Sequence, residues 1–157
     1  TLGKAFGVAG AFVAGDDALI ETLLQRSRNY IFTTAMPSAM AAAISASLKI
    51  VQEEEWRRER IRQLVTRFRE GASELGFALL PSESPIQPLV VGDPGVAVEM
   101  SQKLEQNGCL CTAIRPPTVP VGTSRLRITL TAAPKPQDVD DLLEALTVAR
   151  DEDVKAG

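Results

Sequence analysis

A single lysine stands between two glycines in the first segment of the chain, TLGKAFG at residues 1–7. Gly3 and Gly7 let the backbone turn sharply and approach a ligand closely, just before an apolar run. The segment lacks the spacings of the common phosphate-binding loops, GxxxxGK[ST] and GxGxxG. Lys4 is therefore a candidate catalytic lysine, and a solvated loop lysine is the alternative that its immediate neighbours leave open.

The absence of histidine from the 157 residues narrows the chemistry. Without imidazole, these residues contain no Ser-His-Asp or Cys-His relay and no HExxH zinc site. Proton transfer within them falls to lysine, tyrosine, cysteine or a carboxylate. The 17 Lys and Arg residues against 20 Asp and Glu give a net charge of −3, which predicts no nucleic-acid partner. No apolar run approaches the roughly 20 residues that span a bilayer, so we expect no membrane segment and a cytoplasmic location.

Two arginines alternate with apolar residues in RLRITLT at 125–131. This alternation predicts a strand whose leucine and isoleucine side chains face the core. Arg125 and Arg127 then share the opposite face with Thr129 and Thr131. Two arginines on one face could clamp a carboxylate or a phosphate, and a solvated sheet face is the alternative.

The loop before this strand, IRPPTVPVGTSR at 114–125, is stiffened by three prolines. Arg115, Thr118 and Thr123 place polar groups on this pre-organised backbone. Such loops often line a functional site, and a plain structural connection is the alternative reading.

Cys109 and Cys111 lie two residues apart in a predicted strand, so their side chains point the same way. This spacing is too short for an ordinary structural disulfide, and no further Cys or His completes a metal site. We expect both to be reduced core residues, and no bound metal.

Hydrophobic spacing predicts the elements of the first half of the chain. The apolar run at 7–14 is typical of a buried strand, and Asp16 or Asp17 then caps a short helix. An irregular connection at 29–36 leads to Pro37, which suits the first turn of a helix. From there to residue 75 the pattern is helical, with a bend in the polar run 52–60 and a stop at Gly76. Two apolar stripes follow helical spacing, one at Met40, Ile44, Leu48 and Val51 and another at Ile61, Leu64, Val65, Phe68, Ala72 and Leu75.

After Gly76, short strands alternate with helices, which predicts a domain boundary. Strands are expected at 77–80, 86–91, 109–114 and 125–131, with an edge or a bulge at Pro88. One helix is expected to begin at Asp93 and Pro94 and to end at Gly108, and the last helix to begin at Pro136.

Three segments together identify the chain as a member of a known family. TLGKAFGVAGAF at 1–12, YIFTTAMP at 30–37 and AIRPPTVPVGTSRLRITLTAA at 113–133 resemble, in order and spacing, segments of the α-oxoamine synthases, a branch of the fold type I pyridoxal phosphate enzymes. The resemblance runs from Thr1 to about Leu146. It implies an α/β fold in which the chain is the C-terminal part of a fold type I transferase. The implied parts are the end of the cofactor-binding large domain at 1–36, a connecting helix region at 37–75, a small α/β domain with a mainly antiparallel sheet at 76–150, and a frayed tail at 151–157.

The resemblance also implies a cofactor site. Lys4 matches the lysine that binds pyridoxal phosphate covalently, and Thr1 matches a threonine that hydrogen-bonds the cofactor phosphate. Thr33 and Thr34 lie in a segment that reaches the cofactor phosphate of the neighbouring subunit in relatives. This implies a homodimer with shared active sites.

The implied substrate site lies in the third segment. Arg127 matches the arginine that holds the amino-acid carboxylate, Thr118 matches a substrate-contacting threonine, and Arg115 belongs to the same loop. This loop most resembles the branch of biotin biosynthesis, which condenses L-alanine with a pimeloyl thioester of coenzyme A or acyl carrier protein. Alternatives are a sister branch that uses glycine with an acetyl or succinyl thioester, and a non-catalytic interaction module that retains the fold.

Some expected site residues of the family are not present. In the family, an aspartate that contacts the pyridine nitrogen and histidines near the cofactor ring precede the lysine segment. We therefore expect these 157 residues to be a fragment that is inactive alone, and the intact protein to be the enzyme.

Overall fold

The computed structural model describes the backbone of residues 1–156 and the side chains of residues 1–150. The chain divides into two compact units, one of residues 1–55 and one that begins at Trp56. The division falls inside the expected helix region 37–75, between helix α3 (Ser38–Glu53) and helix α4 (Trp56–Glu74). The bend expected in the polar run is thus confirmed, and the two helices belong to different units. The domain ranges inferred for the intact protein stay a prediction.

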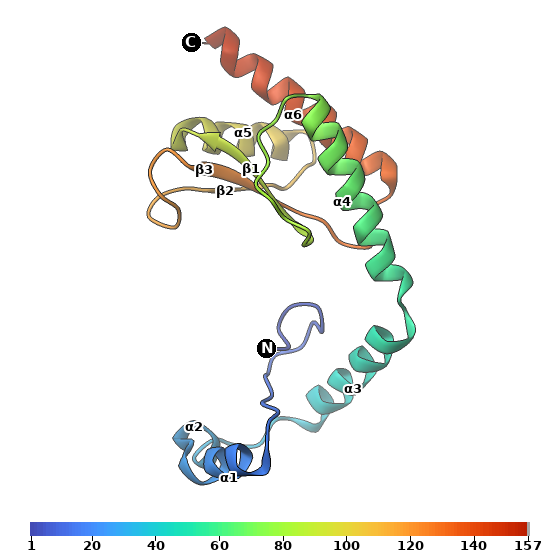
Figure 1. Ribbon diagram of the computed structural model, residues 1–157, viewed down its shortest axis with the longest axis vertical. Coiled ribbons are helices and arrows are strands. Elements are labelled where there is room, and N and C mark those ends of the chain that lie inside the picture. Colours follow the sequence, from blue (N-terminus) through green and yellow to red (C-terminus); the bar gives the residue numbers. More distant parts are fainter. Residues whose placement is uncertain (157) are drawn as a thin grey trace. The chain divides into compact units, whose positions relative to one another are not determined.

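The first unit contains three helices (Figure 1). Helix α1 (Asp17–Arg26) begins as expected, because the Asp16 carboxylate accepts a hydrogen bond of 2.7 Å from the Leu19 amide. Helix α2 (Arg28–Ile31) occupies part of the segment that we expected to be irregular. The difference arises locally, since the Ile31 amide donates to the Ser27 carbonyl at 3.0 Å and closes one helical turn.

The prediction of a buried strand at 7–14 is wrong. The structure gives this segment no strand, and its residues are exposed apart from a half-buried Val8. Gly7 and Gly10 take φ values of +65° and +135°, which bend the backbone out of an extended path. Its backbone bonds to Leu2, through Val8 and Gly10, are too few, because a strand needs a longer ladder of such bonds.

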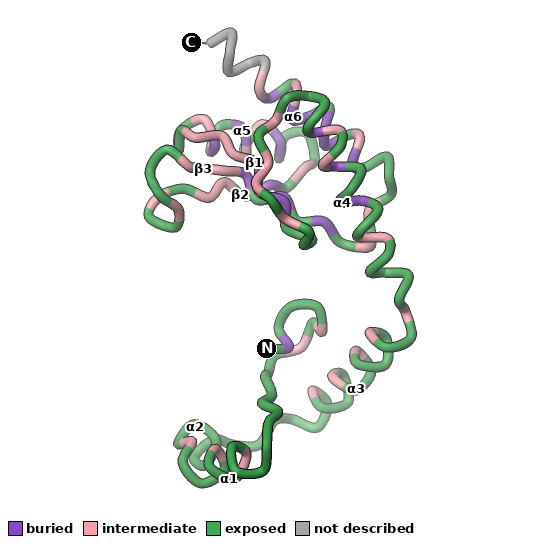
Figure 2. The backbone as a smooth tube through the Cα atoms, viewed as in Figure 1, coloured by how far each residue is buried: buried purple, intermediate pink, exposed green. Residues whose placement is uncertain are grey.

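Helix α3 follows Pro37, as expected, and one face of it is half-buried. Met40, Ile44 and Val51 lie on that face, as predicted, but Leu48 is 45% exposed. Ser47, one residue earlier, takes the half-buried place instead. Figure 2 shows how little of this unit is buried.

The second unit begins with α4, whose expected apolar stripe is buried in its middle, whereas Ile61 is half-buried and Leu75 is 36% exposed. Its fully covered members are Leu64, Val65, Phe68 and Ala72. The helix stops at the glycine that the sequence indicated: Gly76 has φ +77°, and the Phe77 amide donates to the Ala72 carbonyl at 2.9 Å.

The sheet has three strands in the order β1-β3-β2, and both pairings are antiparallel, as expected. The strands are β1 (Ile86–Gly92), β2 (Thr112–Ile114) and β3 (Ser124–Thr129). Pro88 lies in an outer strand of this sheet, and a bulge separates Val90 from Gly92, which confirms the expected irregularity.

Two predicted strands are shorter in the structure than expected. At 77–80 there is one isolated bridge, between Leu79 and Leu89. At 109–114 pairing begins only at Thr112, because the Cys109 amide still donates to the Leu104 carbonyl at the end of the preceding helix. In both cases, the first residue of the predicted strand forms a hydrogen bond that ends the preceding helix, so strand pairing begins later.

One core holds this unit together. Helix α5 (Pro94–Gln106) packs on the sheet, and α6 (Pro136–Ala156) packs on α5 and α4 (Figure 1). Asp93 caps α5, its carboxylate accepting from the Gly95 amide at 2.7 Å, and Gly108 follows its end at φ +79°, as predicted. The leucine and isoleucine side chains that the alternation at 125–131 placed inward are buried, namely Leu126, Ile128 and Leu130. From α6, Val139, Leu142, Leu143 and Leu146 join them in the core.

Among the described residues, the structure contains no helix that is both long enough and apolar enough to cross a bilayer. Helix α6 runs to Ala156, and the side chains of the expected tail at 151–157 lie outside the described residues.

Candidate functional site

Lys4 lies in a loop of residues 2–10 that is closed by its own backbone. The Leu2 amide donates to the Gly10 carbonyl at 2.8 Å, and the Val8 amide donates to the Leu2 carbonyl at 3.2 Å. Within it, the Gly7 amide donates to the Lys4 carbonyl at 2.9 Å and forms a tight turn. Lys4 is exposed, and its amine contacts no hydrogen-bond or ion-pair partner in the described chain. The loop therefore presents a free primary amine on a fixed backbone.

Thr33 and Thr34 line a hollow of about 720 Å³ in the same unit. They follow α2, in the extended stretch that leads to Pro37, and both are exposed. Gly10 and Met36 line the same hollow, and a Cβ at Gly10 would lie 3.1 Å from the Met36 methyl group. Glycine is favoured there by its φ of +135°, and a Cβ would also press on this methyl group.

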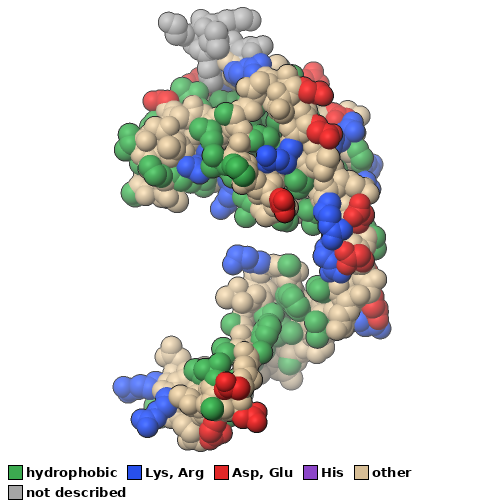
Figure 3. All heavy atoms as spheres, in the orientation of Figure 1, with side chains coloured by type: hydrophobic (Ala, Val, Ile, Leu, Met, Phe, Trp, Pro, Cys, Tyr) green, Lys and Arg blue, Asp and Glu red, His purple; other side chains and the backbone are tan. Residues whose placement is uncertain are grey.

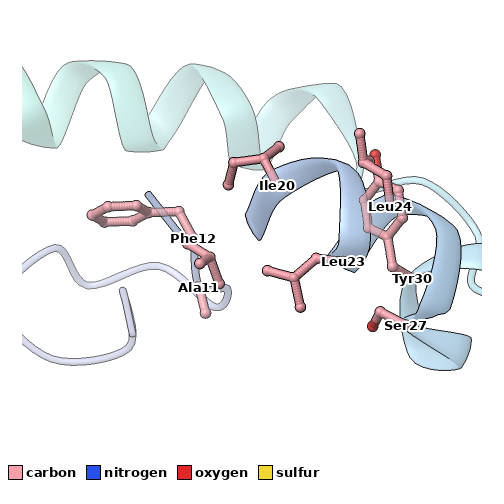
Figure 4. A pocket seen from close by; sticks show the side chains of 8 residues that line it. Ala11, Phe12, Ile20, Leu23, Leu24, Ser27 and Tyr30 are labelled. Carbon is pink, nitrogen blue, oxygen red and sulfur yellow. The ribbon is translucent and has the colours of Figure 1, made fainter. Parts of the chain in front are cut away.

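A second hollow in this unit is apolar (Figure 4). It has a volume of about 330 Å³. Its lining includes Phe12, Ile20, Leu23, Leu24 and Tyr30, which come from the segment before α1, from α1 and from α2. Apart from the hydroxyls of Ser27 and Tyr30, this lining is apolar and holds no charged group, so we assign no chemistry to this hollow.

Arg127 lies in the central strand of the sheet, as the alternation predicted. It is paired with Pro88 of β1 and with Thr112 of β2, and its side chain is exposed. No hydrogen bond or ion pair occupies its guanidinium within residues 1–150. This strand face thus offers a fixed and available cation, with Thr129 two residues along, for an anionic group such as a carboxylate.

Arg125, on the same face, differs because it is already engaged. Its Nε donates to the Thr123 carbonyl at 3.0 Å, and its Nη2 lies 3.1 Å from the Thr123 hydroxyl. Thr123 in turn donates its hydroxyl to the Pro120 carbonyl at 2.7 Å. Arg125 therefore holds the preceding loop, and only Arg127 of the pair is free for a ligand.

The proline-rich loop contains a turn that one backbone hydrogen bond closes. The Thr118 amide donates to the Arg115 carbonyl at 3.0 Å across the cis peptide bond between Pro116 and Pro117. Arg115 and Thr118 are both exposed at this turn. Their positions are compatible with contact to a substrate, and their roles stay a prediction.

One buried polar side chain of strand β1 was not predicted from the sequence. Gln87 is fully buried, and its amide oxygen accepts from Arg69 of α4 at 2.7 Å. Its amide nitrogen donates to the carbonyls of Ser84, at 2.7 Å, and Ser82, at 3.2 Å. Gln87 is the neighbour of Pro88 in β1, so this network fixes the strand that flanks Arg127. A glutamine in an apolar strand was the only available signal.

The two cysteines are free, as expected. Burial raises the pKa of Cys109, and burial together with the nearby Cys109 raises the pKa of Cys111 to about 11. Both thiols are thus protonated and unreactive at neutral pH. In the part of the chain that the structure describes, no group of His, Cys, Asp and Glu side chains could hold a metal ion.

The surface charge is mixed. Figure 3 shows acidic and basic side chains next to each other along the first turns of α4, where Arg62 and Glu59 form an ion pair of 2.8 Å. Such pairing lowers the positive electrostatic potential of the surface, and nucleic-acid binding depends on a strongly positive surface.

Lys4, Thr1, Thr33 and Thr34 lie in the first unit, and Arg115, Thr118 and Arg127 in the second. The chain matches the model of the aminotransferase class I and II family over residues 1–146, so it belongs to that family. The match confirms the expected fold class.

Individual relatives within this family show which of its members the chain resembles. The chain is 59% identical to the 8-amino-7-oxononanoate synthase of Nitrosococcus oceani over 146 residues, which are 93% of this chain and 39% of that protein. The crystal structure of the 8-amino-7-oxononanoate synthase from Francisella tularensis is similar with a TM-score of 0.86 at 30% identity, covering 98% of this chain and 45% of that one. A structure of SPT described with a PLP internal aldimine has a TM-score of 0.88 at 28% identity, covering 95% and 38%. This chain thus spans less than half the length of each of these proteins.

Proposed function

We propose that the intact protein is a pyridoxal phosphate-dependent acyltransferase of biotin biosynthesis. It would condense L-alanine with a pimeloyl thioester of coenzyme A or acyl carrier protein, and release CO₂ and the thiol to give 8-amino-7-oxononanoate. The observation that supports this activity best is the 59% identity to a synthase of that name along 93% of the chain.

The residues of the first unit fit the cofactor. Pyridoxal phosphate requires an amine for its aldehyde and hydrogen-bond donors for its phosphate. Lys4 is an exposed amine without a partner in the described chain, and the hydroxyl-bearing Thr33 and Thr34 are exposed in one hollow. A Cβ at Gly3 or Gly7 would meet nothing within 4 Å, so the turn around Lys4 is open to a ligand.

The proposed roles follow from these groups. When bound, pyridoxal phosphate supplies an electron sink that stabilises negative charge at the amino-acid Cα. The Lys4 amine, when neutral, would remove the Cα proton and return a proton after CO₂ has left, acting first as a general base and then as a general acid. Arg127 would hold the substrate carboxylate through two parallel N–H donors and so fix the orientation of the Cα–H bond.

Thr1, Thr33 and Thr34 would hold the cofactor phosphate. Thr33 and Thr34 would reach the cofactor phosphate of a neighbouring subunit, so the proposal includes a homodimer. It also includes a cytoplasmic location. Sedimentation of the intact protein tests the homodimer, because a monomer that is fully active would contradict it.

Borohydride reduction tests the central claim. The intact protein is loaded with pyridoxal phosphate, reduced with borohydride and digested, and the labelled peptide is mapped. We expect the label on Lys4 and its loss in Lys4→Arg. Label on another residue, or none, would overturn the proposal.

Substrate competition distinguishes the sister reactions. Turnover of alanine with a pimeloyl thioester is compared with turnover of glycine with acetyl and succinyl thioesters. Preference for glycine would assign the protein to a sister branch of the family instead.

A further inference from the structure

Ser47 makes a hydrogen bond that helix α3 does not need for itself. Its hydroxyl donates to the Phe6 carbonyl at 2.9 Å, between residues 41 positions apart in the sequence. Ser45, on the same helix, shows the usual alternative, in which the hydroxyl donates back to the Ala41 carbonyl at 3.1 Å. Ser47 is also the polar member of the half-buried face of α3. Its hydroxyl is therefore used to bind the loop rather than the helix.

The bonded carbonyl belongs to the turn that carries Lys4. Phe6 lies inside the turn closed by the Gly7 amide and the Lys4 carbonyl. The other bonds of the loop join residues 2–10 to one another, so they define its shape but do not attach it to a helix. The Ser47 bond supplies this attachment.

We propose that Ser47 is a positioning residue for Lys4: by holding the Phe6 carbonyl, it fixes the turn from which the lysine amine projects. The inference rests on the proposed function for the use of Lys4, but the attachment itself can be measured without cofactor. Loss of the hydroxyl leaves Lys4 chemically unchanged and lets its backbone move relative to α3.

Amide hydrogen exchange of the intact protein without cofactor measures the attachment. In Ser47→Ala, we expect the Leu2, Gly7 and Val8 amides to exchange about fivefold faster, the effect of one lost hydrogen bond. Ser45→Ala is the matched control, because it removes a hydroxyl from the same helix without touching the loop. Ser47→Thr keeps a hydroxyl and should restore slow exchange.

The rate of labelling measures the consequence for Lys4. After addition of pyridoxal phosphate, the borohydride-reducible label on Lys4 should accumulate about fivefold more slowly in Ser47→Ala, and at the original rate in Ser45→Ala and Ser47→Thr. Equal exchange in the two alanine variants, or faster exchange with unchanged labelling, would overturn the role of Ser47. Absence of label on Lys4 in the unsubstituted protein would instead overturn the proposed function.

Discussion

Arg127 projects from the solvent face of β3 without a partner among the described residues, so a carboxylate can bind it. Arg127→Ala should raise the KM for alanine by about tenfold to a hundredfold, because a charge-assisted pair of hydrogen bonds is lost. The KM for the thioester should change little. Steady-state kinetics of the intact protein, with each substrate varied in turn, measures both values.

Arg125→Ala is the control for this prediction. Arg125 shares the strand face, but it bonds Thr123. It should affect the alanine KM far less than Arg127→Ala. Equal increases in both KM values for Arg127→Ala would contradict the carboxylate clamp.

The sequence could predict residues whose roles are set by local spacing. The alternation of β3 correctly placed Arg127 outside and Leu126 inside, because strand geometry fixes it over a few residues. Ser47 and Gln87 could not be predicted in this way. Their partners, Phe6 and Arg69, lie 41 and 18 residues away, and no local pattern encodes such a distance.

At the scale of elements, one ion pair joins α4 to α6. The Arg67 Nε and Nη2 atoms donate to the two carboxylate oxygens of Asp140, each at 2.7 Å. The hydrogen bond from Arg67 lowers the pKa of Asp140 below its usual value. Because folding lowers this pKa, the ionised carboxylate stabilises the folded state at pH values above the ordinary pKa of the unfolded chain. This stabilisation is lost as the pH falls through the lowered pKa of the folded state.

Asp140→Asn should therefore lower the Tm at pH 7, and the difference from the unsubstituted protein should shrink as the pH falls toward 3. Thermal unfolding at several pH values measures this. Asp141→Asn is the control, because Asp141 bonds only within α6, to Gln137. A difference that persists at low pH would show that the ion pair is not its cause.

Elements differed in how far the sequence could predict them. The longer helices and β3 largely followed their hydrophobic periods, whereas α2 formed in a segment expected to be irregular. The cap at Asp93 is confirmed, and Asp16 rather than Asp17 caps α1. The run at 7–14 has the composition of a buried strand, but composition does not supply a pairing partner. Its exposed Phe12, at 71%, is apolar surface that this unit leaves uncovered.

At the scale of the whole molecule, the two units differ in how they are stabilised. The first buries one hydrophobic residue, Leu2, whereas the large core cluster lies in the second. Burial of apolar surface is the main stabilising contribution to folding. The second unit therefore has the means to fold by itself, whereas the first has little buried apolar surface of its own to stabilise it.

Limited proteolysis of the 157-residue chain with a glutamate-specific protease tests this difference. We expect early cleavage at Glu53–Glu55 and a persistent product that begins near Trp56, because the break between α3 and α4 exposes the backbone there. Mass spectrometry identifies the products. Survival of residues 1–55 after loss of the second unit would contradict the prediction.

The alternation of side chains along the central strand β3 allows the ligand selectivity of such a protein to be changed without disturbing its core. Successive residues of this strand serve different purposes: Leu126 and Ile128 fill the core, while Arg127 and Thr129 face outward. A library that randomises the outward positions, together with Thr112 on the neighbouring strand, would therefore sample new recognition surfaces without removing any buried side chain. Stability and selectivity can thus be varied separately within one short strand.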